Sequence, residues 1–243
     1  MSNALERVEL LVGKESIDKL RKATVIIIGV GGVGSYAAEA LARSGVGKLI
    51  LIDHDVVALS NLNRQIHATY SRVGFSKTES MMQRISTYND ACTVICVDKF
   101  FSLEVESYFT EDIDYVIDAI DTVTSKLDCI ELCHRKGIPC ISSLGMANRF
   151  DPSKVAQTTL DKTTYDPLAK ACRDMAKKRN IRYKIPVVFS SEIPYKQNQE
   201  LNPDGKTRKE RIPPASMVFV PAASGLLCAS IVTRSIMFNP KNL

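Results

Sequence analysis

The sequence predicts an α/β fold in which helices cover both faces of a mostly parallel sheet, with a mixed or antiparallel part added at the C-terminal end. Three observations indicate this fold. Short apolar runs alternate with helical segments as far as Gly145, which is typical of a parallel sheet. A glycine-rich turn at residues 29–34 links the first run to a helix. Beyond Gly145 the alternation weakens, so the second half is expected to extend the same sheet.

Each expected element follows from the spacing of apolar residues and from the residues that punctuate them. Strands are expected where apolar and β-branched residues run together, and helices where apolar residues recur every three or four positions. Gly45 and Gly137 stand where helices should end, a position that favours glycine. The expected strands cover residues 24–28, 48–52, 92–97, 115–120, 138–143, 155–160 and 186–190, and the expected helices cover residues 33–44, 76–88, 102–109, 124–136 and 167–180.

The chain of 243 residues, with 45% hydrophobic content, is large enough for a single domain with a substantial core. We divide it into an N-terminal helical arm (1–22), a nucleotide-binding part (23–145) and a substrate-binding extension (146–243) that includes a loop at 195–214. The apolar segment 217–232 contains Pro221 and Gly225 and is shorter than a membrane span of roughly 20 residues, so we expect a buried helix. No secretory signal is evident at the N-terminus. We therefore expect a cytoplasmic protein that does not contact a membrane.

The segment 25–34, which reads V-I-I-I-G-V-G-G-V-G, is typical of a phosphate-binding turn. Glycines let the backbone approach an anion closely, and the N-terminus of the following helix stabilises negative charge. A carboxylate after the second strand, nineteen residues beyond the last glycine, can accept hydrogen bonds from ribose hydroxyls. This Rossmann-like arrangement fits either NAD or ATP. The residues expected to bind the cofactor here are Gly29, Gly31, Gly32, Gly34 and Asp53.

Two cations after this carboxylate favour ATP over NAD. Arg64 belongs to the segment N-L-N-R-Q, and Lys77 falls in the first turn of a helix that Ser76 and Glu79 would cap. The helix dipole opposes a cation at that position, and an anionic ligand would remove the mismatch. A surface lysine whose cost is tolerated is the alternative. Together the two side chains could grip a triphosphate and stabilise charge as pyrophosphate departs.

Three carboxylates, Asp114, Asp118 and Asp121, flank or lie in the expected strand 115–120. We expect them at its C-terminal end, the edge at which α/β sheets bind ligands. Asp121 is the expected ligand of a hydrated Mg²⁺ ion. Helix-capping acids are the alternative interpretation.

In combination, these motifs resemble the ubiquitin-activating-type adenylating enzymes, the HesA/MoeB/ThiF group, from Arg7 to about Gly145. The resemblance implies that Asp53 holds ribose, that Arg64, Lys77 and Asp121 are the catalytic residues, and that Asp121 serves Mg²⁺. It also implies a homodimer in which Arg7 of the N-terminal arm reaches the ATP site of the partner. The ATP-binding residues added by the resemblance are Asp55, Asn61 and Gln65.

Four further segments resemble the branch of this group that modifies tRNA. They read N-R-Q-I-H-A from Asn63, V-I-D-A-I-D from Val116, D-P-L-A-K from Asp166 and V-F-S-S-E from Val188, so this likeness covers nearly the whole chain. It implies that ATP activates the carboxylate of threonylcarbamoyladenosine at position 37 of tRNA. An intramolecular nucleophile then closes a ring, AMP leaves, and the net change is the loss of one water.

Basic charge gathers in the second half, although the net charge is only +5. Residues 170–184 hold seven Lys and Arg against one Asp, and residues 206–211 hold four against one Glu. A solvated helix face and loop would explain this as well as a surface for a polyanion. The expected tRNA contacts are Lys170, Lys177, Lys178, Arg179 and Arg182, with Arg208 and Lys209 as further candidates.

Seven cysteines without a signal peptide indicate free thiols rather than a disulfide framework. The pairs Cys129/Cys133 and Cys92/Cys96 are spaced as buried small hydrophobes, and structural zinc is not expected. Cys172 stands among cations that could lower its pKa, which leaves a catalytic thiol open as a minor alternative. The three histidines show no triad or metal spacing, so surface or loop roles are expected.

Two other functions stay open at this point. The first is an adenylyltransferase that acts on the C-terminus of a sulfur-carrier or ubiquitin-like protein, although the paired C-x-x-C motifs usual in those enzymes are absent from the sequence. The second is a nucleotide-binding sensor or an NAD-dependent oxidoreductase, which needs only the glycine turn and Asp53.

Overall fold

A seven-stranded sheet organises the chain, whose computed structural model describes residues 4–197 and 214–238. The strand order is β3-β2-β1-β4-β5-β7-β6, and all neighbouring strands are parallel except β7 and β6. The expected mostly parallel sheet with an antiparallel addition is therefore confirmed. The strands are β1 (Thr24–Ile28), β2 (Lys48–Ile52), β3 (Thr93–Val97), β4 (Tyr115–Asp118), β5 (Cys140–Ser143), β6 (Val155–Thr159) and β7 (Pro186–Ser190).

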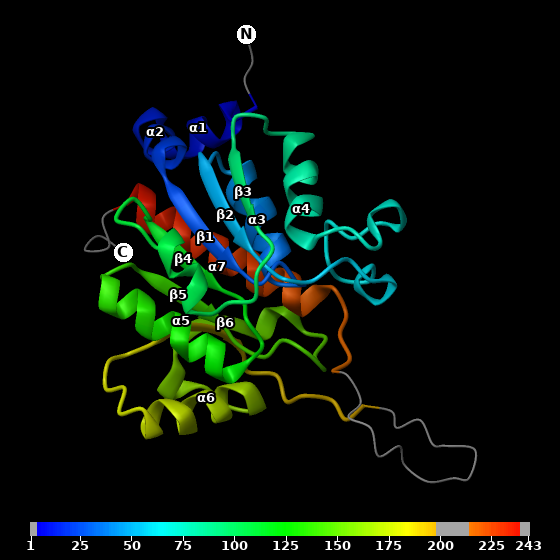
Figure 1. The fold of residues 1–243 in the computed structure, drawn as a ribbon, viewed down its shortest axis with the longest axis vertical. Coiled ribbons are helices and arrows are strands. Elements are labelled where there is room, and N and C mark those ends of the chain that lie inside the picture. Colours follow the sequence, from blue (N-terminus) through cyan, green and yellow to red (C-terminus); the bar gives the residue numbers. More distant parts are fainter. Residues whose placement is uncertain (1–3, 198–213, 239–243) are drawn as a thin grey trace.

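Helices lie on both faces of this sheet (Figure 1). One face packs against α2, α3 and α7, and the other against α5 and a 3₁₀ turn at Leu103–Tyr108, where a short helix was expected. Neighbouring residues of β1 alternate between the two cores and all are buried, as expected for a strand covered on both sides. The helices are α1 (Glu6–Val12), α2 (Lys14–Lys22), α3 (Gly34–Arg43), α4 (Lys77–Ser86), α5 (Val123–Lys136), α6 (Pro167–Lys178) and α7 (Phe219–Met237).

The C-terminal helix α7 is long and apolar enough to cross a membrane by length and composition alone, and half of that window is buried inside the protein. Val220, Cys228 and Val232 are fully buried in the core that α7 shares with α3. Gly225 lets the two helices approach closely, because a Cβ there would lie 2.3 Å from the carbonyl oxygen of Val33. This is the packing of a core helix, as the sequence predicts.

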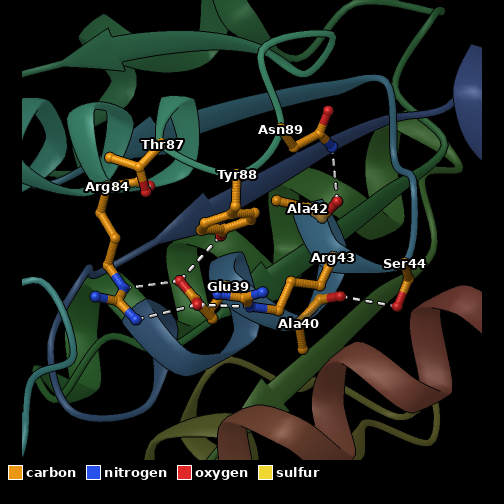
Figure 2. Close-up of polar contacts among 9 residues, drawn as sticks. All are labelled: Glu39, Ala40, Ala42, Arg43, Ser44, Arg84, Thr87, Tyr88 and Asn89. Carbon is orange, nitrogen blue, oxygen red and sulfur yellow. Dashed lines mark hydrogen bonds and ion pairs between the residues drawn. The ribbon is translucent and has the colours of Figure 1, made fainter. Parts of the chain in front are cut away.

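A buried carboxylate ties α3 to α4 and to the residues just after it (Figure 2). Glu39 accepts hydrogen bonds from Arg43 (2.7 Å), from Arg84 (2.9 and 3.2 Å) and from the Tyr88 hydroxyl (2.9 Å). Burial by itself raises the pKa of Glu39, but these hydrogen bonds outweigh it and hold the pKa below its ordinary value. The cluster fixes α3, the helix that follows the glycine turn, against α4, the helix that begins with Lys77.

The N-terminal arm lies at the end of the sheet where β1 and β2 begin (Figure 1). Leu5 packs beside Gly45, which precedes β2, and the buried Leu20 anchors α2 in the core. Leu10 and Leu11 on α1 are each 83% exposed. The arm thus presents an apolar face to solvent at the edge opposite the carboxyl ends of the strands.

Candidate functional site

The glycine turn closes tightly over the carboxyl end of β1. Gly29 has φ of +85°, and a Cβ there would lie 2.7 Å from the carbonyl oxygen of Ala119. A Cβ on Gly34 would lie 1.8 Å from the carbonyl oxygen of Gly29. These two glycines are required by the fold itself.

The middle of the turn differs, because the space beside Gly31 is open. A Cβ at Gly31 would have only Gln65 Nε2 within 4 Å, at 3.9 Å, and its φ lies outside the left-handed region. At Gly32 a Cβ would meet Pro221 at 3.2 Å and the Arg64 side chain at 3.5 Å. Packing does not explain a glycine at position 31, whereas the close approach of a ligand to bare backbone does.

Asp53 is buried at the carboxyl end of β2 and holds the turn in place. The backbone N–H of Val30 donates to Asp53 Oδ2 (2.6 Å), and that of Asp55 donates to Oδ1 (2.9 Å). Each carboxylate oxygen can accept more than one hydrogen bond, so capacity for a ligand hydroxyl remains. Asp53 therefore lies beside the glycine turn, at the position expected from the sequence.

Lys77 is buried at the start of α4, where it forms an ion pair with Asp55 at 2.6 Å. Burial raises the pKa of Asp55, but the hydrogen bond and charge of Lys77 outweigh it and lower that pKa below its ordinary value. The expected mismatch between this cation and the helix dipole is therefore relieved inside the protein. Lys77 is not a tolerated surface lysine, and it needs no ligand to be neutralised.

The segment between β2 and α4 brings three expected residues to the turn. Ala58 donates its N–H to Asn61 Oδ1 (3.0 Å), so the buried Asn61 shapes a local turn. Arg64 is partly exposed and donates to Ser60 O (2.7 Å) and to a neighbouring asparagine. Gln65 is buried, and its Oε1 has no hydrogen-bond partner within the described chain. A cation and an unpartnered acceptor thus flank the open side of the turn.

His67 lies in a loop of this segment, as one of the two expected settings, but it is buried rather than on the surface. It is 2% exposed, and neither ring nitrogen has a hydrogen-bond partner among the described residues. Burial, together with the nearby cations Lys77, Arg84 and Arg72, lowers its pKa to about 4. The imidazole is therefore neutral near pH 7. Its place in N-R-Q-I-H-A was the only signal for it.

The three carboxylates around β4 occupy different sites, so the expectation that they gather at its carboxyl end is wrong for one of them. Asp114 precedes β4 and accepts from the N–H of Thr24 (2.8 Å), at the amino edge. Asp118 is fully buried, pairs with Lys126 at 2.8 Å, and also accepts from Ser142 (2.6 Å). Only Asp121 is exposed beyond the end of β4.

Two groups at this edge could contact a divalent cation. Asp121 has only a 3.4 Å contact from the Thr122 hydroxyl among the interactions of the described residues, so its oxygens are available. Asp53, His54 and Asp55 also have potential ligand atoms within 4.8 Å of one another. Because Lys77 already neutralises Asp55, an exposed acid such as Asp121 fits a hydrated Mg²⁺ better.

The basic segment at residues 170–184 contains both ion-paired and unpaired cations among the described residues. Arg179 forms two ion pairs of 2.6 Å, with Asp128 and Glu131, and Lys184 forms one with Asp161. Four other cations are exposed and form no ion pair within the described chain: Lys170, Lys177, Lys178 and Arg182. Arg208 and Lys209 lie outside the described residues.

Cys172 lies on the buried face of α6, packs in the core and is 1% exposed. Burial raises its pKa to about 11, against the lowered value that a nucleophilic thiol needs. Its burial and raised pKa both argue against a catalytic role for this thiol. All seven cysteines are free, as expected.

The two motifs of the second half have local structural roles. Asp166 caps the N-terminus of α6 and also accepts from the backbone N–H of Gly145 (2.9 Å). Glu192 accepts from the N–H groups of Phe150 and Asp151. They hold the segments that follow β5 and β7 at the same edge of the sheet as the glycine turn.

Comparisons with known proteins agree with this geometry. A family model described as "ThiF family" matches residues 4–237. The tRNA threonylcarbamoyladenosine dehydratase of Bacillus subtilis is 41% identical over 98% of this chain and 96% of that protein. The crystal structure of Escherichia coli tRNA N6-threonylcarbamoyladenosine dehydratase in complex with ATP superposes with a TM-score of 0.86 and 34% identity, covering 98% of this chain and 96% of that one. An adenylyltransferase and sulfurtransferase of Xenopus laevis, MOCS3, is 36% identical over only 51% of this chain and 28% of its own length.

Proposed function

This chain belongs to the ThiF family, and from that premise we propose that it is an ATP-dependent enzyme that cyclises threonylcarbamoyladenosine in tRNA with net loss of water. The observation that carries the proposal is that the match to the Bacillus subtilis dehydratase runs through both halves of the chain. The second half includes the motifs at Asp166 and Val188, which lie outside the nucleotide-binding part. The proposed place of action is the cytoplasm, where tRNA is found.

The geometry supports ATP as the activating substrate. The open backbone at Gly31 lies beside Gln65, the adjacent Gly32 lies beside Arg64, and Asp53 fixes the turn through the N–H of Val30. In the proposed complex Asp53 accepts from ribose hydroxyls, while Asn61, Arg64 and Lys77 lie along the phosphates. Arg64 offers a planar fork where negative charge develops, and Lys77 offers a point charge that its ion pair with Asp55 partly offsets. Asp121 fits a hydrated Mg²⁺, which would supply further neutralisation of phosphate charge.

The proposed reaction needs positioning and charge stabilisation rather than a protein nucleophile. The substrate carboxylate attacks the α-phosphorus of ATP and pyrophosphate leaves, which gives an acyl adenylate. A nucleophilic atom of the same modified base then attacks the activated carbonyl and displaces AMP. One carboxylate oxygen departs with AMP and the nucleophile loses its proton, so the nucleoside loses one water overall.

The whole-length match favours this function over activation of a sulfur-carrier or ubiquitin-like protein. The MOCS3 similarity covers only about half of the chain (51%), and the sequence lacks paired C-x-x-C motifs. An oxidoreductase or nucleotide sensor would not explain a match to the Bacillus subtilis dehydratase over 98% of the chain.

We propose that two copies act together, with Arg7 reaching the ATP site of the partner. Arg7 is exposed on α1, at the amino edge of the sheet, and so lies at the opposite edge from the glycine turn of its own chain. Leu10 and Leu11, each 83% exposed on the same helix, provide an apolar surface for a second copy. Mixing Arg7→Ala subunits with Arg64→Ala subunits tests this sharing. In a mixed dimer one of the two sites keeps both arginines, so the mixture should be more active than either parent protein, and no gain in activity would contradict the proposal.

For tRNA we propose contacts through Lys170, Lys177, Lys178 and Arg182. Arg179 is left out because two carboxylates already neutralise it. The variant Lys177→Glu/Lys178→Glu should bind tRNA more weakly, with the slope of log affinity against log salt reduced by about 1 for each lost phosphate contact. Arg179→Gln is the matched control and should change the slope less. Unchanged affinity in the double variant would move the tRNA surface elsewhere.

The direct test is to incubate the protein with ATP, Mg²⁺ and tRNA carrying threonylcarbamoyladenosine. The tRNA is then digested and the masses of its nucleosides are measured by mass spectrometry. A product lighter by one water supports the proposal, and its absence when ATP is omitted links it to activation. A different result would favour the adenylyltransferase alternative. In that case the nucleoside would be recovered unchanged, and ATP would be consumed only when a sulfur-carrier or ubiquitin-like protein is added.

A variant pair locates the chemistry at this site. Arg64→Ala should lower turnover by about 10²- to 10³-fold, the usual effect of one charge-stabilising donor, while leaving the fold intact because the side chain is partly exposed. Arg135→Ala is the control, since that arginine is exposed near the C-terminal end of α5 and, among the described residues, pairs with Glu106. Near-wild-type turnover in Arg64→Ala would contradict the assigned role.

A further inference from the structure

Three cysteine sulfurs meet at a place far from the glycine turn. Cys129 and Cys133 are one helical turn apart on the same face of α5, and Cys140 is the first residue of β5. Their Sγ atoms all lie within 4.8 Å of one another. The first two side chains are fully buried, whereas Cys140 is partly exposed. The sequence spacing indicated that Cys129 and Cys133 are buried small hydrophobes and gave no reason to expect zinc, because Cys140 joins them only through the packing of α5 on β5.

The spacing of the sulfurs suits one soft cation. Zinc lies about 2.3 Å from each thiolate sulfur, which puts sulfurs about 3.8 to 4.0 Å apart in tetrahedral or trigonal geometry. That separation falls within the observed limit, so small side-chain adjustments suffice. Soft thiolates select Zn²⁺ and Cu⁺ over hard cations. Three of them on a rigid helix and strand form a preorganised ligand set.

A cavity of about 190 Å³ beside the cluster provides access. Cys133 and Cys140 line it, together with His134 and Tyr183, whose rings stack at 3.6 Å between centroids and 13° between planes. The Tyr183 hydroxyl is buried without a hydrogen-bond partner in the described chain. The cavity has room for water at an open coordination position, and the phenol could donate to an anionic sulfur or to that water.

The site is separate from nucleotide chemistry. The strands β5 and β7 begin at the cavity, whereas Asp53 and Gly31 lie where the strands end. Cys133 lies ten residues along α5 from its first residue, which corresponds to about 15 Å. Metal binding here therefore succeeds or fails independently of the proposed ATP site.

We propose that Cys129, Cys133 and Cys140 form a three-thiolate site for a thiophilic d¹⁰ cation of the Zn²⁺ and Cu⁺ class, open on the side of the cavity lined by His134 and Tyr183. Each thiol that ligates releases its proton to solvent, and no oxidation or reduction takes place. Bound metal ties α5 to the start of β5, so it stabilises the native state by a free energy that grows with the logarithm of the metal concentration over its dissociation constant.

The test uses the full-length chain, reduced and freed of metal, titrated with Cd²⁺ as a spectroscopic probe. One equivalent should produce the ultraviolet charge-transfer absorption of thiolate-bound cadmium and raise the midpoint of thermal unfolding. Separate titrations with Zn²⁺ and Cu⁺ against chromophoric chelators then rank the two cations. Absence of the charge-transfer band with every sulfur reduced would overturn the proposal.

Single variants identify the ligands. Loss of a group that merely supports a ligand costs about 10- to 100-fold in metal affinity, so Cys140→Ser should cost at least about 100-fold. Because Cys140 is partly exposed, this variant is expected to fold even if Cys129→Ser does not. Cys92→Ser is the matched control, a buried cysteine outside the cluster, and should bind as wild type. Equal affinity in Cys140→Ser and wild type would contradict the assignment.

Discussion

Substitution of Gly31 separates the needs of ATP binding from the needs of the fold. In Gly31→Ala the new methyl meets only Gln65 Nε2 at 3.9 Å, an ordinary contact, and the backbone is not left-handed. Reduced freedom of the unfolded chain should then stabilise the protein by about 0.4 to 1 kcal/mol. Gly34→Ala is the contrast, because its methyl would lie 1.8 Å from a carbonyl oxygen and the turn must break.

The same methyl should weaken ATP binding strongly. A phosphate oxygen bonded to a backbone N–H sits about 2.9 Å away, whereas a methyl keeps other heavy atoms at about 3.5 Å or more. If two hydrogen bonds to the charged phosphate are lost, at about 1.5 to 3 kcal/mol each, the cost is about 3 to 6 kcal/mol. That corresponds to a loss of about 10²- to 10⁴-fold in affinity.

Urea unfolding and isothermal titration calorimetry of Gly31→Ala measure the two effects separately. The expected result is a protein at least as stable as wild type that binds ATP weakly or not at all. Wild-type ATP affinity would show that the open space beside Gly31 is not the phosphate site. A large loss of stability would show instead that the turn itself requires this glycine.

Two further predictions concern buried charge. Lys126→Met leaves Asp118 unpaired at 0% exposure and should lower the free energy of unfolding by about 3 to 5 kcal/mol in urea titrations, whereas a loss below about 1 kcal/mol would mean that the pair is not buried as described. His67 has a folded pKa of about 4 against an ordinary value of 6.5, so the unfolded state binds the proton more tightly. Its neutral form therefore supports stability above pH 6.5, and that support declines as pH falls from 6.5 to 4, by at most about 3 kcal/mol. In His67→Phe stability should depend less on pH across this window, and an unchanged dependence would contradict the buried neutral imidazole.

The spacing of apolar residues predicted most of the strands. It misplaced strand ends where a side chain or a proline interrupts the backbone hydrogen bonds between strands. Residues of β1, β2 and β7 were predicted with their observed bounds. The strand β4 ends at Asp118 rather than at residue 120, because the Asp118 carboxylate accepts from the N–H of Ile120 and turns the chain. The strand β5 begins at Cys140 rather than at residue 138, because Pro139 has no N–H to donate to a ladder.

The strand, turn and helix around the glycine turn were predictable because they are adjacent in sequence. Its electrostatic partners were not. Asp55 neutralises Lys77 and Lys126 neutralises Asp118 only because separate elements pack together. Apolar spacing along one segment carries no information on such pairs, and the same limit hid the approach of Cys140 to Cys129.

The contact of α7 with the glycine turn would make the proposed nucleotide binding depend on the finished polypeptide. Pro221 abuts Gly32, and Gly225 packs on the first turn of α3, yet both leave the ribosome long after that turn has been synthesised. A nascent chain halted before residue 219 has the residues proposed to bind phosphate but not the helix that packs against them. We therefore expect release from the ribosome to precede the first productive encounter with ATP.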